Sequence, residues 1–482
     1  MDYAEFVSKE KSLIIAPAGY GKTHAIAECL KYTKGKQLIL THTHAGVASL
    51  KEKIQKEGIT PKQYHVETIE GFAQKYVNAF YNGNDKPEQY DSQHYYPFIR
   101  EKADAILKLI PVKDVIRATY SGLFVDEYQD CTNDQHHFID SLACILPTRI
   151  MGDPLQGIFG FGGQQLVDFD KGLAHYEKFP DLNEPWRWKH TNPDLGHTLH
   201  ELRRKLENKE NIDLDLYKAN IEVVYTKETD KYSPNTEYNK KIWDLTHENN
   251  VLIIHPDSSN LNARKEFVSR FSNIFFLVEA IDSKDFYEYS RKFDEASTDN
   301  FYKILYEIMP YIFNGTSVRD IWFNKNGIKK KKNEKDKNVI APIQNELKKI
   351  EQNLFFSGIS KILKMIRNLP NIKCYRKELF LDLCKALEKA DYKCTSVYEA
   401  MIEIRNAKRR MGRKMYNKCI GTTLLTKGLE FDTVAILDAH NFKCHKNFYV
   451  AITRARKRLI IFTNTKDLIP YAINSIIEMR SS

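Results

Sequence analysis

A glycine-rich segment near the N-terminus has the composition of a phosphate-binding loop. It lies between an apolar run at 12–16 and a helical pattern at 25–30. Its residues are Ala18, Gly19, Tyr20, Gly21, Lys22 and Thr23. Glycines let backbone N–H groups approach phosphate oxygens, and the following helix N-terminus adds a partial positive charge. Lys22 would then reach the β- and γ-phosphates of a nucleoside triphosphate, and the Thr23 hydroxyl would ligate Mg²⁺.

Ala16 departs from the usual spacing, because it stands where most such loops have their first glycine. The alternative interpretation is an ordinary turn between a strand and a helix. The Gly21-Lys22-Thr23 run between an apolar run and a helical pattern favours the phosphate loop.

Two adjacent carboxylates follow a second apolar run. Asp126 and Glu127 come directly after residues 122–125, at the carboxyl end of a predicted buried strand. Ligand crevices of open α/β sheets lie at this edge. A phosphate loop requires one acidic residue for Mg²⁺ and a second carboxylate to orient or deprotonate the attacking water. We assign the first role to Asp126 and the second to Glu127; a capping or solvated acidic turn is the alternative.

Further apolar runs predict the strands that position these groups. They lie at 37–41, 122–125, 149–151, 251–254, 433–437 and 458–462. The first run, the phosphate loop, its helix and the run at 37–41 form a βαβ unit, which implies a parallel sheet with right-handed crossovers. Residues from about 290 to 415 are predicted to be a helical insertion, and the basic segment 324–338 within it a solvated loop.

Composition limits the class of protein. The chain has 482 residues, of which 42% are apolar and 28% charged, and this excludes a disordered or fibrous protein. Lys plus Arg number 73 against 63 Asp plus Glu, so the net charge of +10 is compatible with a polyanionic partner. The eight cysteines lack zinc-ligand spacing and are expected to be reduced. No membrane-spanning or signal segment is present, so we expect a cytoplasmic protein.

Residues 126–130, Asp-Glu-Tyr-Gln-Asp, resemble the DExQD signature of the UvrD/Rep branch of superfamily 1 helicases. The resemblance recurs in order along the chain. The matching segments are 38–45, 67–72, 152–161, 184–187, 422–431 and 449–455.

The resemblance implies an α/β fold of two RecA-like parallel-sheet P-loop domains, each with a short helical insertion. The first domain would span residues 1–185, with an insertion at about 73–115. The second would span residues 186–482, with an insertion at about 291–415. Residues 190–245 and the helical insertion carry no recognisable motif.

The resemblance also assigns roles around a bound ATP and Mg²⁺. Gln156 would sense the γ-phosphate, and Arg187 and Arg454 would contact it from the second domain. Glu430 would contact the ribose or couple the two binding sites. Without this context, each arginine would be interpreted as a surface salt-bridge residue.

The implied DNA contacts are Phe159 and Phe161 for base stacking, with Thr41, His42 and Thr68 near the phosphates. The alternative for the two phenylalanines is one buried side of a strand, and for the histidine a structural role. The predicted partner is single-stranded DNA or a junction of single and double strands, and no membrane.

Several departures from the family pattern affect base and DNA recognition. No Gln lies upstream of the phosphate loop, where relatives read adenine, and Glu70, Leu424 and Gly162 replace common DNA-side residues. The leading hypothesis is a 3′ to 5′ ATP-dependent single-strand translocase or helicase. The alternative is a regulatory or DNA-sensing ATPase subunit of a bacterial anti-phage defence complex, acting with a nuclease or another defence or repair protein.

Overall fold

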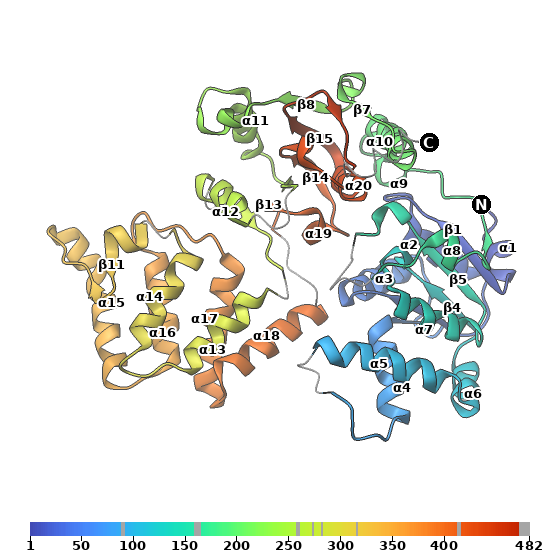
Figure 1. The fold of residues 1–482 in the computed structure, drawn as a ribbon, viewed down its shortest axis with the longest axis horizontal. Coiled ribbons are helices and arrows are strands. Elements are labelled where there is room, and N and C mark those ends of the chain that lie inside the picture. The colour runs from blue at the N-terminus through green and yellow to red at the C-terminus, as the bar shows by residue number, and fades with distance from the viewer. Residues whose placement is uncertain are drawn as a thin grey trace, which may run out of the picture. The chain divides into compact units, whose positions relative to one another are not determined.

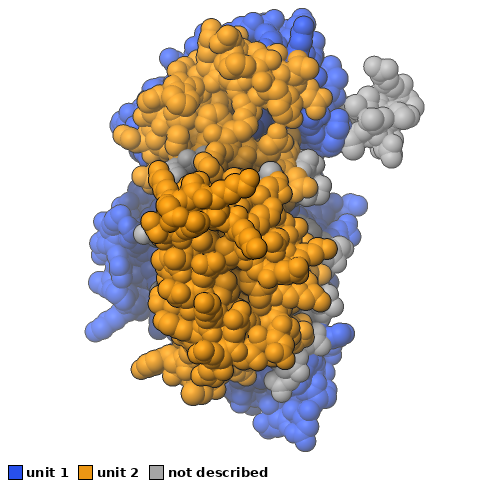
Figure 2. Space-filling model, turned by 90° about the vertical axis from the view of Figure 1, so that its left-hand side faces the viewer, with its two compact units in different colours: residues 1–227, 427–482 blue, residues 228–426 orange. Residues whose placement is uncertain are grey.

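A computed structural model describes most of the chain. The described residues are 1–87, 92–158, 165–256, 261–271, 274–280, 283–314, 317–411 and 416–471. The fold divides into two compact units (Figure 2). Unit 1 comprises residues 1–227 and 427–482, and unit 2 comprises residues 228–426.

The first sheet of unit 1 carries the phosphate loop. Its six strands have the order β3-β2-β4-β5-β1-β6, and all their pairings are parallel. The strands are β1 (Lys11–Ile15), β2 (Gln37–Thr41), β3 (Tyr64–Thr68), β4 (Gly122–Val125), β5 (Thr148–Gly152) and β6 (Glu177–Lys178). One strand, β5, therefore separates the strand before the phosphate loop from the strand before the two carboxylates.

Alternation along these strands builds two cores, because successive side chains point to opposite faces of a sheet. Leu38 and Leu40 of β2 enter the core on one face, whereas Ile39 between them enters the core on the other. Helices cover both faces of the sheet (Figure 1). They are α1 (Tyr3–Ser8), α2 (Lys22–Lys31), α3 (His44–Lys56), α4 (Ile69–Phe80), α5 (Ser92–Leu107), α6 (Ile110–Thr119), α7 (Asn133–Ala143) and α8 (Phe169–Gly172).

The rest of unit 1 comes from two distant parts of the chain. Residues 186–227 supply α9 (Trp186–Lys189), α10 (Pro193–Glu207), β7 (Ile212–Asp213) and β8 (Glu222–Tyr225). Residues 427–471 supply β14 (Phe431–Ile436), α20 (His445–Ile452), β15 (Ala455–Thr463) and β16 (Asp467–Leu468). The Trp188 indole donates to the Ala455 carbonyl at 2.7 Å, so α9 is attached to the start of β15.

A second six-stranded sheet has the order β10-β13-β9-β14-β15-β8. Its remaining strands are β9 (Val251–Ile254), β10 (Phe276–Leu277) and β13 (Lys418–Gly421). The described registers in this sheet are all parallel. The predicted α/β class with two parallel sheets is confirmed.

Unit 2 contains a helical cluster with its own core, drawn in yellow and orange in Figure 1. Its helices are α13 (Lys284–Asp294), α14 (Phe301–Ile312), α15 (Glu334–Gln352), α16 (Phe356–Arg367), α17 (Lys377–Lys393) and α18 (Val397–Met411). Two shorter helices, α11 (Glu237–Leu245) and α12 (Leu261–Arg270), precede the cluster, and α19 (Thr423–Thr426) follows it. The helices α14 to α18 lie within the residues from about 290 to 415 that the sequence predicts to be helical.

The basic segment at 324–338 differs from the predicted solvated loop. It contains the hairpin β11 (Phe323–Asn324) and β12 (Gly327–Ile328), and α15 begins within it. The Lys329 ammonium donates to the Asp320 carbonyl at 2.8 Å, and Lys331 lies 4.0 Å from the Trp322 ring centroid. Two of the lysines are therefore packed against the preceding turn.

All eight cysteines are free thiols, as the sequence predicts. Within the described residues, no helix has the length and apolarity needed to cross a membrane.

Candidate nucleotide site

The phosphate loop connects β1 to α2 through two glycines in the left-handed region. Gly19 and Gly21 both have φ of 81°. A Cβ added at Gly19 would lie 2.6 Å from the Trp188 ring, and one at Gly21 would lie 2.8 Å from Trp186. Conformation and space therefore both require glycine at these positions.

Backbone donors of the loop are open to an anion. Among the described residues, no partner accepts from the N–H groups of Gly19, Gly21, Lys22 or Thr23, and no side chain caps α2. The first N–H groups of a helix lack intrahelical partners and carry the positive end of the helix dipole. The loop thus has the donor set of a phosphate site.

Ala18 and Tyr20 differ from these open donors. The Ala18 N–H donates to Asp153 Oδ2 at 3.1 Å and to the Tyr449 hydroxyl at 3.2 Å. The buried Tyr20 side chain is directed to α10, where its hydroxyl lies 2.8 Å from His200 Nδ1. These two residues hold the loop in place through contacts with the protein.

Lys22 lies against both predicted catalytic carboxylates. Its ammonium is 3.1 Å from Asp126 Oδ1 and 2.6 Å from Glu127 Oε1. Burial alone would raise the pKa of Glu127, but Lys22 and Lys427 outweigh burial and lower it to about 2. Glu127 has φ of 56°, a left-handed conformation that is unusual outside glycine and is found at functional sites.

The oxygen donors present fit Mg²⁺, which prefers hard oxygen ligands. Asp126 follows β4, and its contact with Lys22 places it beside the first turn of α2, where Thr23 lies. The Thr23 hydroxyl forms no hydrogen bond with a described residue, so it is available as a ligand. Thr23 and Asp126 are therefore the residues that would hold the ion.

Glutamines connect Glu127 to the segment after β5. The Gln129 amide donates to Glu127 Oε2, and its oxygen accepts from the Asp153 N–H at 2.9 Å. Gln156 donates to Asp153 Oδ2 at 2.9 Å. The predicted γ-phosphate sensor is thus tied to the predicted catalytic base through Asp153 and Gln129.

The arginines predicted to contact the γ-phosphate lie in the same unit as the loop. The Arg187 N–H donates to the Gly19 carbonyl at 2.9 Å, and its guanidinium lies 2.7 Å from Glu430 Oε1. The Arg187 Nε is buried and has no hydrogen-bond partner among the described residues. This orphaned donor beside the phosphate loop fits a phosphate oxygen as its acceptor.

Arg454 is 1% exposed and is held mainly by backbone oxygens. It donates to the carbonyls of Val450 at 2.9 Å and Leu429 at 3.1 Å, and it lies 3.5 Å from Gln156 Oε1. Burial, followed by the nearby Arg187 charge, lowers the pKa of Arg454 to about 10. An anion bound here would relieve this unfavourable concentration of positive charge.

Sequence reasoning missed a buried ion pair that supports the loop. Arg203 of α10 lies 2.7 Å from Asp153 Oδ1 and donates to the Tyr449 hydroxyl at 2.8 Å. Asp153 and Tyr449 are the two acceptors of the Ala18 N–H. No motif contains Arg203, which is followed by the exposed Arg204 on an amphipathic helix, so the sequence gives no signal to single it out.

A second missed pair involves Lys427, at the start of the C-terminal part of unit 1. Its ammonium lies 2.5 and 2.6 Å from the two Asp130 carboxylate oxygens and also donates to the Gln156 carbonyl. Burial raises the pKa of Asp130 to about 7, although Lys427 opposes the shift. The DExQD aspartate and a lysine of a later motif are therefore paired.

The predicted DNA contacts lie in varied surroundings. Thr41 and Thr68 are paired in the register of β2 and β3 and are both buried, and Thr68 caps α4 by accepting from the Gly71 N–H at 2.9 Å. His42 is partly buried, with Nε2 3.5 Å from Cys131 Sγ. Phe159 and Phe161 lie outside the described residues. The DNA-binding role of these five residues stays a prediction.

The lowered pKa of His42 predicts that the stability of the protein depends on pH. Burial and then Lys427 lower its pKa to about 4, against about 6.5 for an ordinary histidine. Protons therefore bind preferentially to the unfolded chain, so the stability from neutral His42 is present above pH 6.5 and is lost as pH falls toward 4. As the pH falls from 6.5 to 4, the free energy of unfolding should decrease less in His42→Gln than in the wild type. The difference between the two decreases should be up to about 3 kcal/mol.

The measurement is urea unfolding at several pH values. His44→Gln, the same change at an exposed position of unit 1, is the matched control. If the free energy of unfolding fell equally with pH in the wild type and in His42→Gln, the lowered pKa of His42 would be refuted.

The phosphate loop, the paired carboxylates and the two arginines form a set of residues suited to binding and hydrolysing a nucleoside triphosphate. The model of the UvrD/REP helicase N-terminal domain matches residues 102–177, and that of the viral superfamily 1 RNA helicase core domain matches residues 378–463. The resemblance to UvrD/Rep-like superfamily 1 helicases is confirmed.

One curated relative matches over nearly its whole length. Gabija protein GajB of Bacillus cereus (strain VD045) is 22% identical over 516 residues, covering 95% of this chain and 94% of that protein. This chain is therefore similar to GajB over nearly the whole length of both proteins.

Solved structures of Arterivirus nonstructural protein 10 (helicase) were also matched. The complex with DNA has a TM-score of 0.35 at 11% identity, and the protein alone has 0.31 at 10%. Both alignments cover 95% of this chain, which spans only 62% and 61% of those chains. At these TM-scores the likeness carries no argument.

Proposed function

We propose that the protein hydrolyses ATP with Mg²⁺ and couples hydrolysis to single-stranded DNA or to a junction of single and double strands. One observation carries the proposal: Lys22, Arg187 and Arg454, from three separate segments, gather with Glu127 and Gln156 in unit 1. Phosphoryl transfer spreads negative charge over the γ-phosphoryl oxygens, so cations from several directions stabilise the transition state.

Lys22 links nucleotide binding to activation of Glu127. Without nucleotide its ammonium neutralises both carboxylates and keeps the pKa of Glu127 low, which makes Glu127 a weak base. On binding ATP, Lys22 turns to the β- and γ-phosphates, and the pKa of Glu127 rises. Thr23 and Asp126 would hold Mg²⁺, whose charge would offset that of the phosphate oxygens. Glu127 then orients and deprotonates the attacking water.

The leading form of this function is a 3′ to 5′ single-strand translocase or helicase of the UvrD/Rep type. Lys22 and Glu127 belong to the predicted first RecA-like domain, and Arg187 and Arg454 to the second. Bound ATP would draw these domains together, and product release would let them part. Repeated cycles would move the motor along the strand.

The near-full-length similarity to GajB favours a second form of the function. In this form the protein is a DNA-sensing or regulatory ATPase subunit of an anti-phage defence complex, with little processive unwinding. The departure at Glu70 fits this form, because its carboxylate accepts from Arg100 and Gln135, both at 2.9 Å, and so is engaged by the protein. Duplex unwinding by the chain alone would favour the first form, and a requirement for a copurifying nuclease or other defence or repair protein would favour the second.

The test is steady-state ATP hydrolysis with and without an unstructured single strand. We expect strong stimulation by the strand. Replacing Phe159 and Phe161 by Ala should weaken strand binding by roughly 1–3 kcal/mol per lost stacking contact, as measured by fluorescence anisotropy. Replacing both by Trp should retain binding, because the stacking faces remain. Hydrolysis indifferent to DNA, with unaltered affinity in the Ala variant, would contradict the proposal.

A further inference from the structure

A groove of about 450 Å³ lies on unit 2, and none of the residues that line it belongs to a motif. It is lined by Tyr232, Pro234, Asn235, Asn239, Lys240, Trp243, Arg270 and Phe271. Its volume is in the range of small-molecule sites. The lining combines aromatic rings with amides and cations and contains no carboxylate, so its chemistry is distinct from that of an ordinary surface depression.

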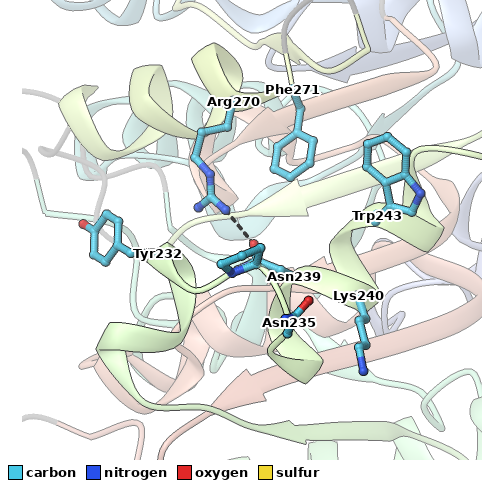
Figure 3. Close-up of a pocket in the computed structure, with 8 residues that line it drawn as sticks. Tyr232, Asn235, Asn239, Lys240, Trp243, Arg270 and Phe271 are labelled. Carbon is cyan, nitrogen blue, oxygen red and sulfur yellow. Dashed lines mark hydrogen bonds between the residues drawn. The ribbon is translucent and has the colours of Figure 1, made fainter.

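The aromatic rings are presented to solvent. Tyr232 is 69% exposed and Trp243 is 58% exposed, values that exclude a role for either ring in the core. Figure 3 shows Tyr232 and Trp243 on either side of Arg270 and Asn239, with Phe271 beside Arg270. Exposed rings of this kind offer flat faces on which a nucleic-acid base can stack.

The cations of the groove have no acidic partner among the described residues. Neither Lys240 nor Arg270 forms a salt bridge with a described residue, whereas the exposed Lys31 of α2 and Lys56 of α3 each pair with a glutamate of their own helix. The guanidinium of Arg270 forms one hydrogen bond in the described structure, to Asn239 Oδ1 at 2.5 Å. An anionic group is the complement that this lining lacks.

Asn239 fixes the geometry of the groove. Its amide donates to the carbonyls of Asp230 and Ser233, both at 2.8 Å, and its oxygen accepts from Arg270. These bonds attach the loop that carries Tyr232 and Asn235 to α11 and to the end of α12. The groove is therefore held open before any ligand arrives, which lowers the entropic cost of binding.

We propose that this groove binds one nucleotidyl group, with its base stacked on Trp243 and its phosphate contacted by Lys240 and Arg270. We infer that this nucleotidyl group belongs to a single strand, and in this respect the inference rests on the proposed function. A free nucleotide presents the same chemistry to the groove. An exposed aromatic face and cations that no described carboxylate neutralises are the two elements that sequence-independent strand binding requires.

The first experiment compares two double variants of the full chain. Trp243→Ala with Lys240→Glu alters the groove. Tyr392→Ala with Lys385→Glu makes the same kinds of change, with the same change in net charge, on α17 of the same unit. Tyr392 is 89% exposed and Lys385 is exposed, so both variants are expected to fold, and thermal unfolding checks this.

Affinity for a 20-nucleotide oligothymidylate is measured by anisotropy over a salt series. The groove variant is expected to bind about 5- to 150-fold more weakly, and its salt dependence to be shallower because a phosphate contact is lost. Trp243→Phe, which keeps a stacking face, should retain most of the affinity. The α17 variant should bind as the wild type does.

A second measurement separates the two sources of the ligand. The wild type and Trp243→Phe are each titrated with the oligothymidylate and with thymidine monophosphate. The difference between their fluorescence gives the emission of Trp243. Quenching at far lower oligonucleotide concentration identifies the strand, and equal quenching by the monophosphate identifies a free nucleotide.

The proposed function and the groove fail in different ways. Absent strand binding with unstimulated hydrolysis rejects the proposed function, and the monophosphate titration then decides the groove. A second outcome overturns the groove proposal alone. In it the strand stimulates hydrolysis, the groove and α17 variants bind the strand equally well, and neither ligand quenches Trp243.

Discussion

Glu127→Gln is expected to lower ATP turnover by about 10²- to 10⁴-fold while nucleotide binding is retained. Gln has the shape of Glu and can still accept from Gln129, so the local structure is preserved. The carboxylate that would deprotonate water is lost, and so is one negative charge beside the anionic nucleotide. The affinity for ATP should therefore stay the same or increase, as measured by equilibrium binding alongside single-turnover hydrolysis.

Glu52→Gln is the matched control, because it makes the same change on the exposed face of α3, where Glu52 pairs with Lys56. It should hydrolyse ATP at the wild-type rate. Unchanged hydrolysis in Glu127→Gln would reject the catalytic assignment and would show that another group activates the water.

Arg203→Met is expected to reduce the free energy of unfolding by about 3–5 kcal/mol, because it leaves a buried carboxylate without its cation. Asp153 is fully buried and accepts from the Ala18 N–H, so the loss of Arg203 also loosens the phosphate loop. We expect KM for ATP to rise more than kcat falls. Urea unfolding and steady-state kinetics are the measurements.

Arg204→Met is the control, since it removes the neighbouring exposed arginine from the same helix. The double variant Arg203→Met with Asp153→Asn should recover part of the lost stability, because neither charge of the pair is then left buried without its partner. Equal unfolding free energies for Arg203→Met and Arg204→Met would show that the buried pair does not stabilise the loop.

Local patterns predicted much of the fold around the site. The strand at 37–41 corresponds residue for residue to β2, and the run at 251–254 to β9. Short apolar runs followed by glycine or carboxylates are strong local signals, because a parallel strand buried on both faces can contain few polar residues. The basic segment at 324–338 was harder to predict, since the packing of Lys331 on Trp322 depends on a ring nine residues away.

The supporting contacts of the site were beyond local patterns. Arg203 and Tyr449 are 246 residues apart in the chain and yet share a hydrogen bond. Lys427 and Asp130 are 297 residues apart. The sequence placed Asp130, Lys427 and Tyr449 in motifs but did not pair them, and Arg203 carried no signal at all.

By itself, the sequence determined the chemistry: a phosphate loop at 18–23, two carboxylates after a buried strand, and arginines in ordered motifs. These follow from residue type and short spacing, which chain connectivity preserves. Only the tertiary structure decided which cation neutralises which carboxylate, because a buried charge takes its partner from whatever the fold brings within a few ångströms. The fold in this way pairs Lys22 with Glu127 and Arg203 with Asp153. It also brings together the residues that line the groove on unit 2.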